Sequence, residues 1–132
     1  MTNYIFTHGT LTDQELLEAI CKAKPVETID PAMVNGSLYI TTYGLPVAFE
    51  SGTGIVMGVL YQFKPEEMRY VLKRLDLYET NLVCYVRKKV VVKTEHEKID
   101  AWIYWGRGNM FSSEGLTYIN DGDYRRFNRP PY

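Results

Sequence analysis

A short apolar run near the start of the chain, followed by a glycine and a helix signal, constrains the fold most. The run from Tyr4 to Phe6 is aromatic and β-branched and predicts a buried strand. Gly9 allows a sharp turn because it has no Cβ. Thr12 and Glu15 have the spacing of a capping box, which predicts a helix with Thr12 as its N-cap. We therefore expect a strand, a turn and a helix in close succession.

The turn in this segment bears on ligand binding. A strand that ends before residue 8 and a helix that begins after residue 12 leave several backbone N–H groups without a partner in either element. Such groups can hold a carboxylate or another anion. An ordinary strand-to-helix connection has the same pattern, so both interpretations stay open on this segment alone.

Strand patterns dominate the rest of the chain, with two amphipathic helix patterns among them. The first helix is expected over residues 13–23, with an apolar stripe that ends at Cys21. The second is expected from Pro65 to about residue 75. Residues 110–132 contain glycine, asparagine and proline, and an irregular tail is expected there. Strands are expected over residues 26–30, 33–41, 47–49, 55–63, 83–93 and 99–105. Mostly consecutive strands with two helices predict an α+β fold with a curled, barrel-like sheet.

Length and charge limit the possible functions. A chain of 132 residues is expected to form a single domain over residues 1–132 with a core of its own. The net charge of −1 argues against a nucleic-acid binder that neutralises many phosphates. The chain has no signal-peptide pattern and no apolar run that approaches a membrane span, so no membrane partner and a cytoplasmic location are expected. Two cysteines and two histidines predict neither a disulfide framework nor a metal site.

Two carboxylates stand out as candidates for chemistry. Asp76 and Glu79 are three residues apart at the expected end of the second helix, which could bring them to one side of its exit. Apolar neighbours on both sides of Glu79 could bury it and raise its pKa toward that of a useful base. A solvated loop carboxylate fits the same pattern. Cys84 with His8 is a weaker candidate for nucleophilic catalysis, because a cysteine in a strand is more often part of the core.

Several short motifs follow one another along the chain in a fixed order. They are His8-Gly9-Thr10-Leu11, Gly36-Ser37-Leu38-Tyr39, Val56-Met57-Gly58-Val59-Leu60-Tyr61, Leu75-Asp76-Leu77-Tyr78-Glu79, Tyr85-Val86-Arg87, Ala101-Trp102-Ile103-Tyr104 and Gly122-Asp123-Tyr124-Arg125. Each motif is weak alone. In this order and spacing they resemble the γ-glutamylcyclotransferase-like family, which includes γ-glutamylamine cyclotransferases and small bacterial relatives, and the resemblance spans nearly the whole chain.

The resemblance implies a fold and a reaction. The fold would be α+β, a small mixed β-barrel with flanking helices. The substrate would be a γ-glutamyl amine or another γ-glutamylated metabolite, whose α-amino group attacks its own γ-carbonyl and releases 5-oxoproline and a free amine. Glu79 would be the general acid/base. Tyr85 would hydrogen-bond the substrate or Glu79, and no metal or organic cofactor is implied. The backbone that would bind the substrate's α-carboxylate and neighbouring oxygens belongs to His8, Gly9, Thr10 and Leu11.

Two positions depart from the family pattern. His8 stands where a tyrosine is usual, and Thr80 stands where a glycine commonly follows the glutamate. Both departures predict a shifted substrate specificity, and His8 could serve as a second proton carrier. Selectivity is expected in residues 40–54 and 106–120.

The sequence leaves the amine and the oligomeric state open, and two other functions fit it. One is a non-catalytic binder of a small carboxylate ligand on the same fold. The other is a partner-binding module that uses the aromatic surface or the arginine-rich tail, for which a solvated terminus is the simpler interpretation.

Overall fold

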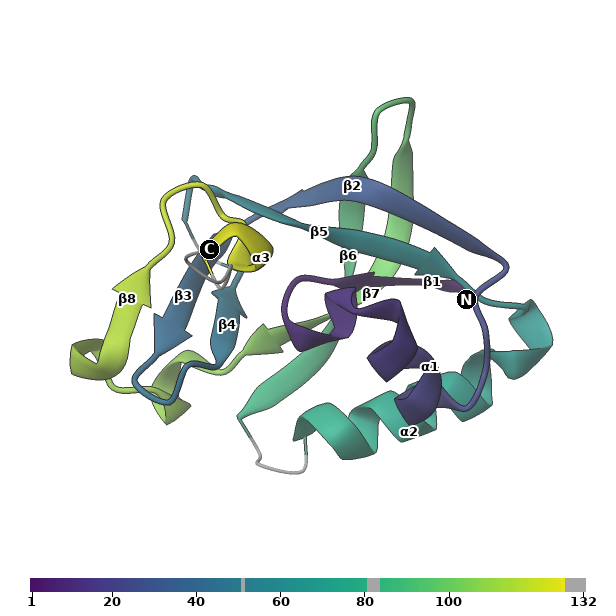
Figure 1. Cartoon of the computed structure of the whole chain (residues 1–132), viewed down its shortest axis with the longest axis horizontal. Helices are drawn as coiled ribbons and strands as arrows, with labels where there is room; N and C mark the ends of the chain where they lie inside the picture. Colours follow the sequence, from purple (N-terminus) through teal and green to yellow (C-terminus); the bar gives the residue numbers. More distant parts are fainter. Residues whose placement is uncertain (51, 81–83, 128–132) are drawn as a thin grey trace.

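The computed structural model describes residues 1–50, 52–80 and 84–127. In this part of the chain, five strands close into a barrel in the order β1-β5-β2-β6-β7, and a second sheet has the order β4-β3-β8 (Figure 1). The strands are β1 (Tyr4–Thr7), β2 (Glu27–Asn35), β3 (Ser37–Thr41), β4 (Pro46–Phe49), β5 (Ile55–Gln62), β6 (Tyr85–Lys93), β7 (Lys98–Gly106) and β8 (Leu116–Tyr118). The expected α+β fold with a small mixed barrel is confirmed.

Helices cover one side of this barrel. The α-helices are α1 (Gln14–Cys21), α2 (Met68–Thr80) and α3 (Tyr124–Phe127), and the 3-10 turns are η1 (Thr10–Thr12), η2 (Pro65–Glu67), η3 (Gly108–Met110) and η4 (Ser113–Gly115). Helices α1 and α2 lie together on the same side of the barrel (Figure 1). None of the helices in the described part of the chain is long and apolar enough to span a bilayer.

The barrel closes through the first strand. β1 pairs antiparallel with β5 and parallel with β7, where Ile5 faces Trp102. β6 and β7 form the expected hairpin. Gly58 on β5 permits the close approach of β1, because a Cβ at that position would overlap the carbonyl oxygen of Thr7.

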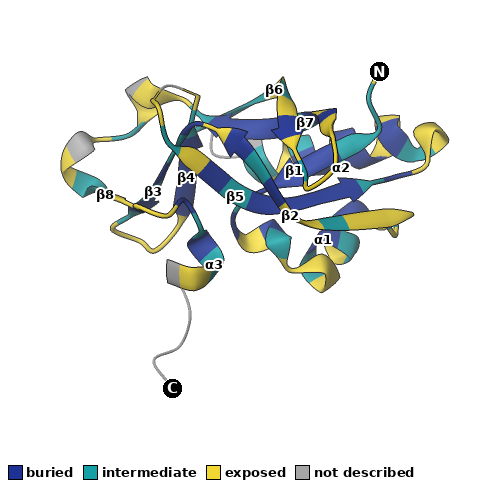
Figure 2. Ribbon diagram, turned by 90° about the horizontal axis from the view of Figure 1, so that it is seen from above, coloured by how far each residue is buried: buried dark blue, intermediate teal, exposed yellow. Residues whose placement is uncertain are grey.

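The core has two parts. Figure 2 shows the buried residues of the strands and helices in dark blue. One part fills the barrel and includes Phe6 and Trp105. The other lies between the barrel and helices α1 and α2 and includes Leu17, Tyr61 and Leu75, all fully buried. Full burial of each of these large side chains contributes roughly 1.5–3 kcal/mol, so the second part fixes the two helices on the barrel wall.

The predicted capping box is wrong by one residue. The N-cap of α1 is Asp13, whose Oδ1 accepts a hydrogen bond from the N–H of Glu15 at 3.1 Å. The hydroxyl group of Thr12 instead donates to the carbonyl oxygen of Gly9 at 2.7 Å, within the 3-10 turn η1. The extra turn explains the difference, because it moves the start of the helix past Thr12.

Two predicted element boundaries are also wrong. Helix α2 continues past residue 75 to Thr80, and residues 76–80 contain neither the glycine nor the proline that would end it. The strand predicted over residues 26–30 and the first part of that predicted over residues 33–41 form one strand, β2, with a register shift against β5 between Ile29 and Ala32; the rest of the second prediction is β3, in the other sheet. Such a bulge accommodates proline within a sheet.

The C-terminal segment is more ordered than the sequence indicates. Residues 110–132 are predicted to be irregular, yet β8 pairs with β3, and α3 follows. The side chains of Ile119 and Tyr124 are buried in the barrel core. Val83, the expected first residue of β6, lies outside the described residues.

Candidate active site

A cavity of about 180 Å3 lies where β1, η1, β4, α2, β6 and β7 meet. A single water molecule needs roughly 10–15 Å3 on this scale, so the cavity has room for a small organic molecule. Its described lining residues are Ile5, Phe6, Thr7, His8, Gly9, Thr10, Leu11, Leu45, Pro46, Leu75, Tyr78, Glu79, Tyr85 and Tyr104. All the site residues predicted from the sequence are among them, and their roles stay predictions.

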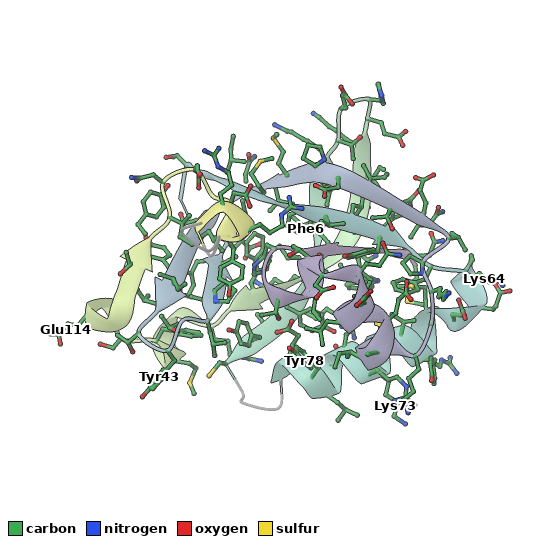
Figure 3. The ribbon with its side chains drawn as sticks, viewed as in Figure 1. Phe6, Tyr43, Lys64, Lys73, Tyr78 and Glu114 are labelled. Carbon is green, nitrogen blue, oxygen red and sulfur yellow. The ribbon has the colours of Figure 1, made fainter. Side chains whose placement is uncertain are left out.

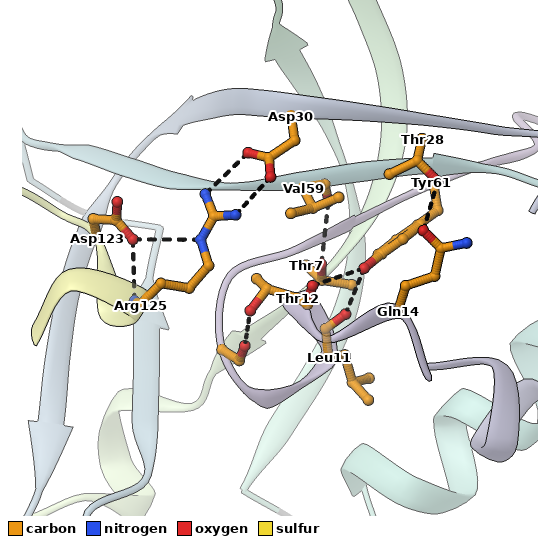
Figure 4. A network of polar contacts seen from close by, with 11 residues as sticks. Thr7, Leu11, Thr12, Gln14, Thr28, Asp30, Val59, Tyr61, Asp123 and Arg125 are labelled. Carbon is orange, nitrogen blue, oxygen red and sulfur yellow. Dashed lines mark hydrogen bonds and ion pairs between the residues drawn. The ribbon is translucent and has the colours of Figure 1, made fainter. Parts of the chain in front are cut away.

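The turn after β1 supplies the polar backbone of the cavity. The carbonyl oxygen of Gly9 accepts hydrogen bonds from the N–H and the hydroxyl group of Thr12. Tyr61 Oη donates to the carbonyl oxygen of Leu11 at 3.1 Å (Figure 4). These bonds fix the turn through its carbonyl groups. Within the described residues, the backbone N–H groups of Gly9, Thr10 and Leu11 donate no hydrogen bond. The turn therefore offers donors that a bound anion could use.

Pro46 packs against this turn from the second sheet. A Cβ on Gly9 would lie 2.5 Å from Pro46 Cγ, so only glycine fits there without a shift. Tyr85 Oη donates a long hydrogen bond of 3.4 Å to the carbonyl oxygen of Pro46, and not to Glu79 as the sequence had allowed. Burial, followed by the nearby charge of Glu79, raises the pKa of Tyr85 to about 12, so its hydroxyl group stays protonated. Tyr85 thus braces β4 at the edge of the cavity.

Glu79 lies on the last turn of α2, with its side chain half-buried at the cavity. Burial raises its pKa from 4.5 to about 7. Its carboxyl group makes no hydrogen bond or ion pair to another described residue. Near neutral pH both protonation states are populated, as a group that accepts and returns a proton requires. The alternative of a solvated loop carboxylate is wrong, because Glu79 is helical and faces the cavity.

Tyr78 lies one residue before Glu79 on α2, as labelled in Figure 3, and also lines the cavity. Its Oη lies 3.4 Å from the hydroxyl oxygen of Thr10, a contact between α2 and η1. Thr80 follows Glu79 as the last helical residue, and its side chain lies outside what the structure describes.

His8 is held in its neutral form. Its Nε2–H donates to the carbonyl oxygen of Tyr104 at 3.3 Å, and burial lowers the pKa of the ring. Its Nδ1 is buried without a hydrogen-bond partner in the described part of the chain. A neutral ring can accept a hydrogen bond through Nδ1, but its lowered pKa makes it a poor second proton carrier at neutral pH.

A cluster behind the cavity was not anticipated as a unit. Tyr104, which lines the cavity, donates from Oη to Asp76 Oδ1 at 2.5 Å. Arg87 Nε lies 2.9 Å from the same oxygen, and its guanidinium group stacks over Trp102 at 4.7 Å. Burial and the Asp76 carboxylate raise the pKa of Tyr104. The sequence motifs contain Asp76, Arg87 and Tyr104 separately, but only the pairing of β6 with β7 beside α2 brings them together.

The weaker candidates lie apart from this cavity. Cys84 and His96 are not among its described lining residues, and the side chain of His96 is 87% exposed. In the described part of the chain, no three or more histidine, cysteine or acidic side chains gather as metal ligands would.

Comparisons with known proteins give a family match for most of the chain. A family model described as "Gamma-glutamyl cyclotransferase, AIG2-like" matches residues 5–126. A search of curated proteins finds no match.

Solved structures share the fold. A protein from Arabidopsis thaliana is 22% identical, with a TM-score of 0.70 over 95% of this chain and 81% of its own. An AIG2-like protein from Mus musculus is 17% identical, with a TM-score of 0.68 over 89% of this chain and 86% of its own. A structure titled γ-glutamyl cyclotransferase is 15% identical, with a TM-score of 0.60 over 87% of this chain and 68% of its own. At these identities the likeness concerns the fold alone.

Proposed function

This chain belongs to the γ-glutamyl cyclotransferase, AIG2-like family, and we propose that it converts a γ-glutamyl amine or another γ-glutamylated metabolite to 5-oxoproline and a free amine. The observation that carries the proposal is Glu79. Its carboxyl group has a pKa of about 7. It lines the same cavity as Gly9, Thr10 and Leu11, whose backbone N–H groups donate no hydrogen bond within the described residues. A proton acceptor and an anion-binding turn are the two elements that this reaction needs.

The turn would hold the substrate by its charge. A γ-glutamyl compound carries an α-carboxylate, which several backbone N–H groups can bind. This contact would place the α-ammonium group near Glu79 and the γ-carbonyl within the cavity. Since the nucleophile and the electrophile belong to one molecule, a correctly folded substrate supplies much of the entropic advantage.

Glu79 would move protons in both halves of the reaction. It takes a proton from the α-ammonium group, and the freed nitrogen bonds to the γ-carbon. The oxyanion that forms is stabilised by the backbone N–H groups. The bond from the γ-carbon to the amine nitrogen then breaks as Glu79 returns the proton to that nitrogen. Glu79 then carries a second proton from the ring nitrogen to the released amine. The ring nitrogen therefore keeps one hydrogen, and the amine leaves as an ammonium ion.

The neutral surroundings of Glu79 suit this role. An unperturbed glutamate with a pKa near 4.3 is a poor match for an amine with a pKa near 8. A pKa of about 7 brings the two groups within roughly one pH unit of each other, so proton transfer costs little in either direction.

The test is release of 5-oxoproline from a panel of γ-glutamyl compounds. The panel contains γ-glutamyl amino acids, glutathione, γ-glutamyl-ε-lysine and simple γ-glutamyl alkylamines, and each is tested with the parent and with Glu79→Gln. We expect turnover of at least one compound by the parent and a loss of kcat of about a hundredfold or more in Glu79→Gln, as for removal of a general acid/base.

Glu66→Gln is the matched control. It makes the same chemical change at an exposed position in η2, away from the cavity, and is expected to retain activity. If Glu79→Gln kept its activity, Glu79 would not be the base. Binding of a γ-glutamyl compound without turnover by the parent would instead identify a non-catalytic carboxylate binder.

A further inference from the structure

A second cavity, of about 410 Å3 and open to solvent, lies on the three-stranded sheet. Four of its described lining residues are aromatic or apolar, and the others are Ser37, Gly52 and Gly108. The four are Tyr39 from β3, Phe49 from β4, Phe111 after η3 and Leu116 from β8. Each of these four side chains is only partly buried, so their apolar surface faces the opening.

The rings of this cavity form one connected group. The ring centroids of Tyr39 and Phe49 are 5.7 Å apart, and those of Phe49 and Phe111 are 5.6 Å apart, both in edge-to-face geometry. Such pairs hold one another in place, so the cavity has a defined shape before any ligand binds.

The group of rings reaches the first cavity. Tyr85, which lines the cavity around Glu79, has its ring centroid 6.0 Å from that of Phe111. The two cavities therefore lie on either side of the Tyr85–Phe111 pair. Strand β4 contributes to both cavities, since Pro46 at its start lines the first and Phe49 at its end, on the opposite face of the strand, lines the second. Three strand residues span roughly 10 Å, a distance that a γ-glutamyl amide with a ring-bearing amine can cover.

We propose that the cavity bounded by Tyr39, Phe49 and Phe111 is the subsite for the amine portion of the substrate, and that it takes a flat, uncharged apolar group. This inference rests on the proposed function. The γ-carbonyl group beside Glu79 is the point at which the amine is attached, so the amine extends out of the first cavity. Beyond Tyr85, the ring of Phe111 offers apolar surface, with its centroid 6.0 Å from that of Tyr85.

The composition of the described lining decides the class of amine. It contains no lysine, arginine, histidine, aspartate or glutamate among the described residues. A carboxylate on the amine portion, as in a γ-glutamyl amino acid, would lose water there without gaining a counter-charge. An aromatic amine would stack against the rings instead.

The experiment compares two substrates with the same γ-glutamyl group, γ-glutamyl benzylamide and γ-glutamyl methylamide. We expect the parent to favour the benzylamide in kcat/KM by about tenfold or more, a discrimination typical of apolar pockets. The variant Gly108→Leu adds an apolar side chain at a residue that lines the cavity, and no neighbouring heavy atom lies within 4 Å of the new Cβ. It is expected to lower the benzylamide-to-methylamide ratio about tenfold.

Gly115→Leu is the matched control, because it adds the same side chain outside the cavity lining, where the new Cβ meets only Thr42 at 3.7 Å. It should leave the ratio unchanged. Turnover of both amides with no preference, or a ratio that Gly108→Leu does not alter, would overturn the subsite while the proposed function stands.

Absence of turnover for both amides would count against the proposed function, and binding then decides the subsite. Saturation-transfer NMR would measure contact between the protein and the phenyl group of the benzylamide. Contact in the parent and the Gly115→Leu variant, but not in Gly108→Leu, would support an apolar ligand site. Equal contact in all three proteins, or in none, would overturn it.

Discussion

At the scale of single residues, Glu79 shows how burial alone can prepare a proton acceptor. Desolvation is the cause of its raised pKa, and no like charge contributes. The ionised carboxylate is therefore the costly form, while the neutral form is accommodated. The nearby Asp76 instead accepts a hydrogen bond from Tyr104 and forms an ion pair with Arg87. Two carboxylates three residues apart on one helix thus have different environments.

The burial of Glu79 predicts a pH-dependent cost in stability. Its pKa is about 7 in the folded chain and 4.5 in the unfolded chain, so the folded chain binds more protons between these pH values. The free energy of unfolding then falls as the pH rises from 4.5 to 7 and stays low above 7. Because the side chain is only half-buried, we expect Glu79→Gln to be more stable than the parent by about 2 kcal/mol at pH 8.

Urea unfolding of both proteins between pH 4.5 and pH 8 measures this difference. The difference should nearly disappear at pH 4.5, where the glutamate is neutral in the folded chain and about half neutral in the unfolded chain. Glu66→Gln, at an exposed position, should match the parent throughout. A Glu79→Gln variant that was no more stable than the parent at pH 8 would show that the carboxyl group is better solvated than its position indicates.

At the scale of elements, the sequence predicted existence and type well and boundaries less well. The strand from Tyr4, the α1 stripe and the β6–β7 hairpin follow from residue periodicity, which local contacts preserve. The N-cap was misassigned to Thr12 because η1 adds a turn that has no sequence signature. Strand β8 and helix α3 were missed because they are short and gain their stability from partners distant in sequence.

The candidate site was predictable in part for the same reason. Glu79 and the turn at residues 8–11 carry recognisable motifs and were named from the sequence. The contributions of Leu45 and Pro46, and the link from Asp76 to Tyr104, depend on how the second sheet and α2 pack on the barrel. No local pattern encodes those contacts.

The packing of β4 on the turn gives a prediction at this scale. A methyl group on Gly9 would collide with Pro46 Cγ, so Gly9→Ala should lower the free energy of unfolding by about 1–3 kcal/mol through overpacking. Pro46→Ala removes the colliding atom. The double variant should therefore be more stable than the sum of the single effects predicts, by about 1 kcal/mol. Urea unfolding of the four proteins measures this coupling, and additive effects would show that the strain lies in the turn itself.

At the scale of the whole molecule, the C-terminal segment links the three-stranded sheet to the barrel. The carbonyl oxygen of Gly122 accepts a hydrogen bond from the N–H of Met57 at 2.8 Å, and a Cβ on Gly122 would overlap the carbonyl oxygen of Ile55. Arg125 makes two hydrogen bonds to Asp30 on β2, at 2.8 and 3.1 Å (Figure 4). The interpretation of Arg125 as part of a solvated terminus is therefore wrong, since its charge is used within the fold.

The apolar part of this segment should matter more than its ion pairs. The side chain of Tyr124 is 8% exposed and belongs to the barrel core, so Tyr124→Ala should lower the free energy of unfolding by about 3 kcal/mol. Arg125 and Asp30 are 34% and 46% exposed, so Arg125→Ala should cost only about 0.5–1 kcal/mol. Urea unfolding measures the free energy of unfolding of both variants and shows which one loses more. Arg126→Ala, with a side chain 71% exposed, is the control and should match the parent. A larger effect of Arg125→Ala than of Tyr124→Ala would mean that charge, not burial, holds the segment on the barrel.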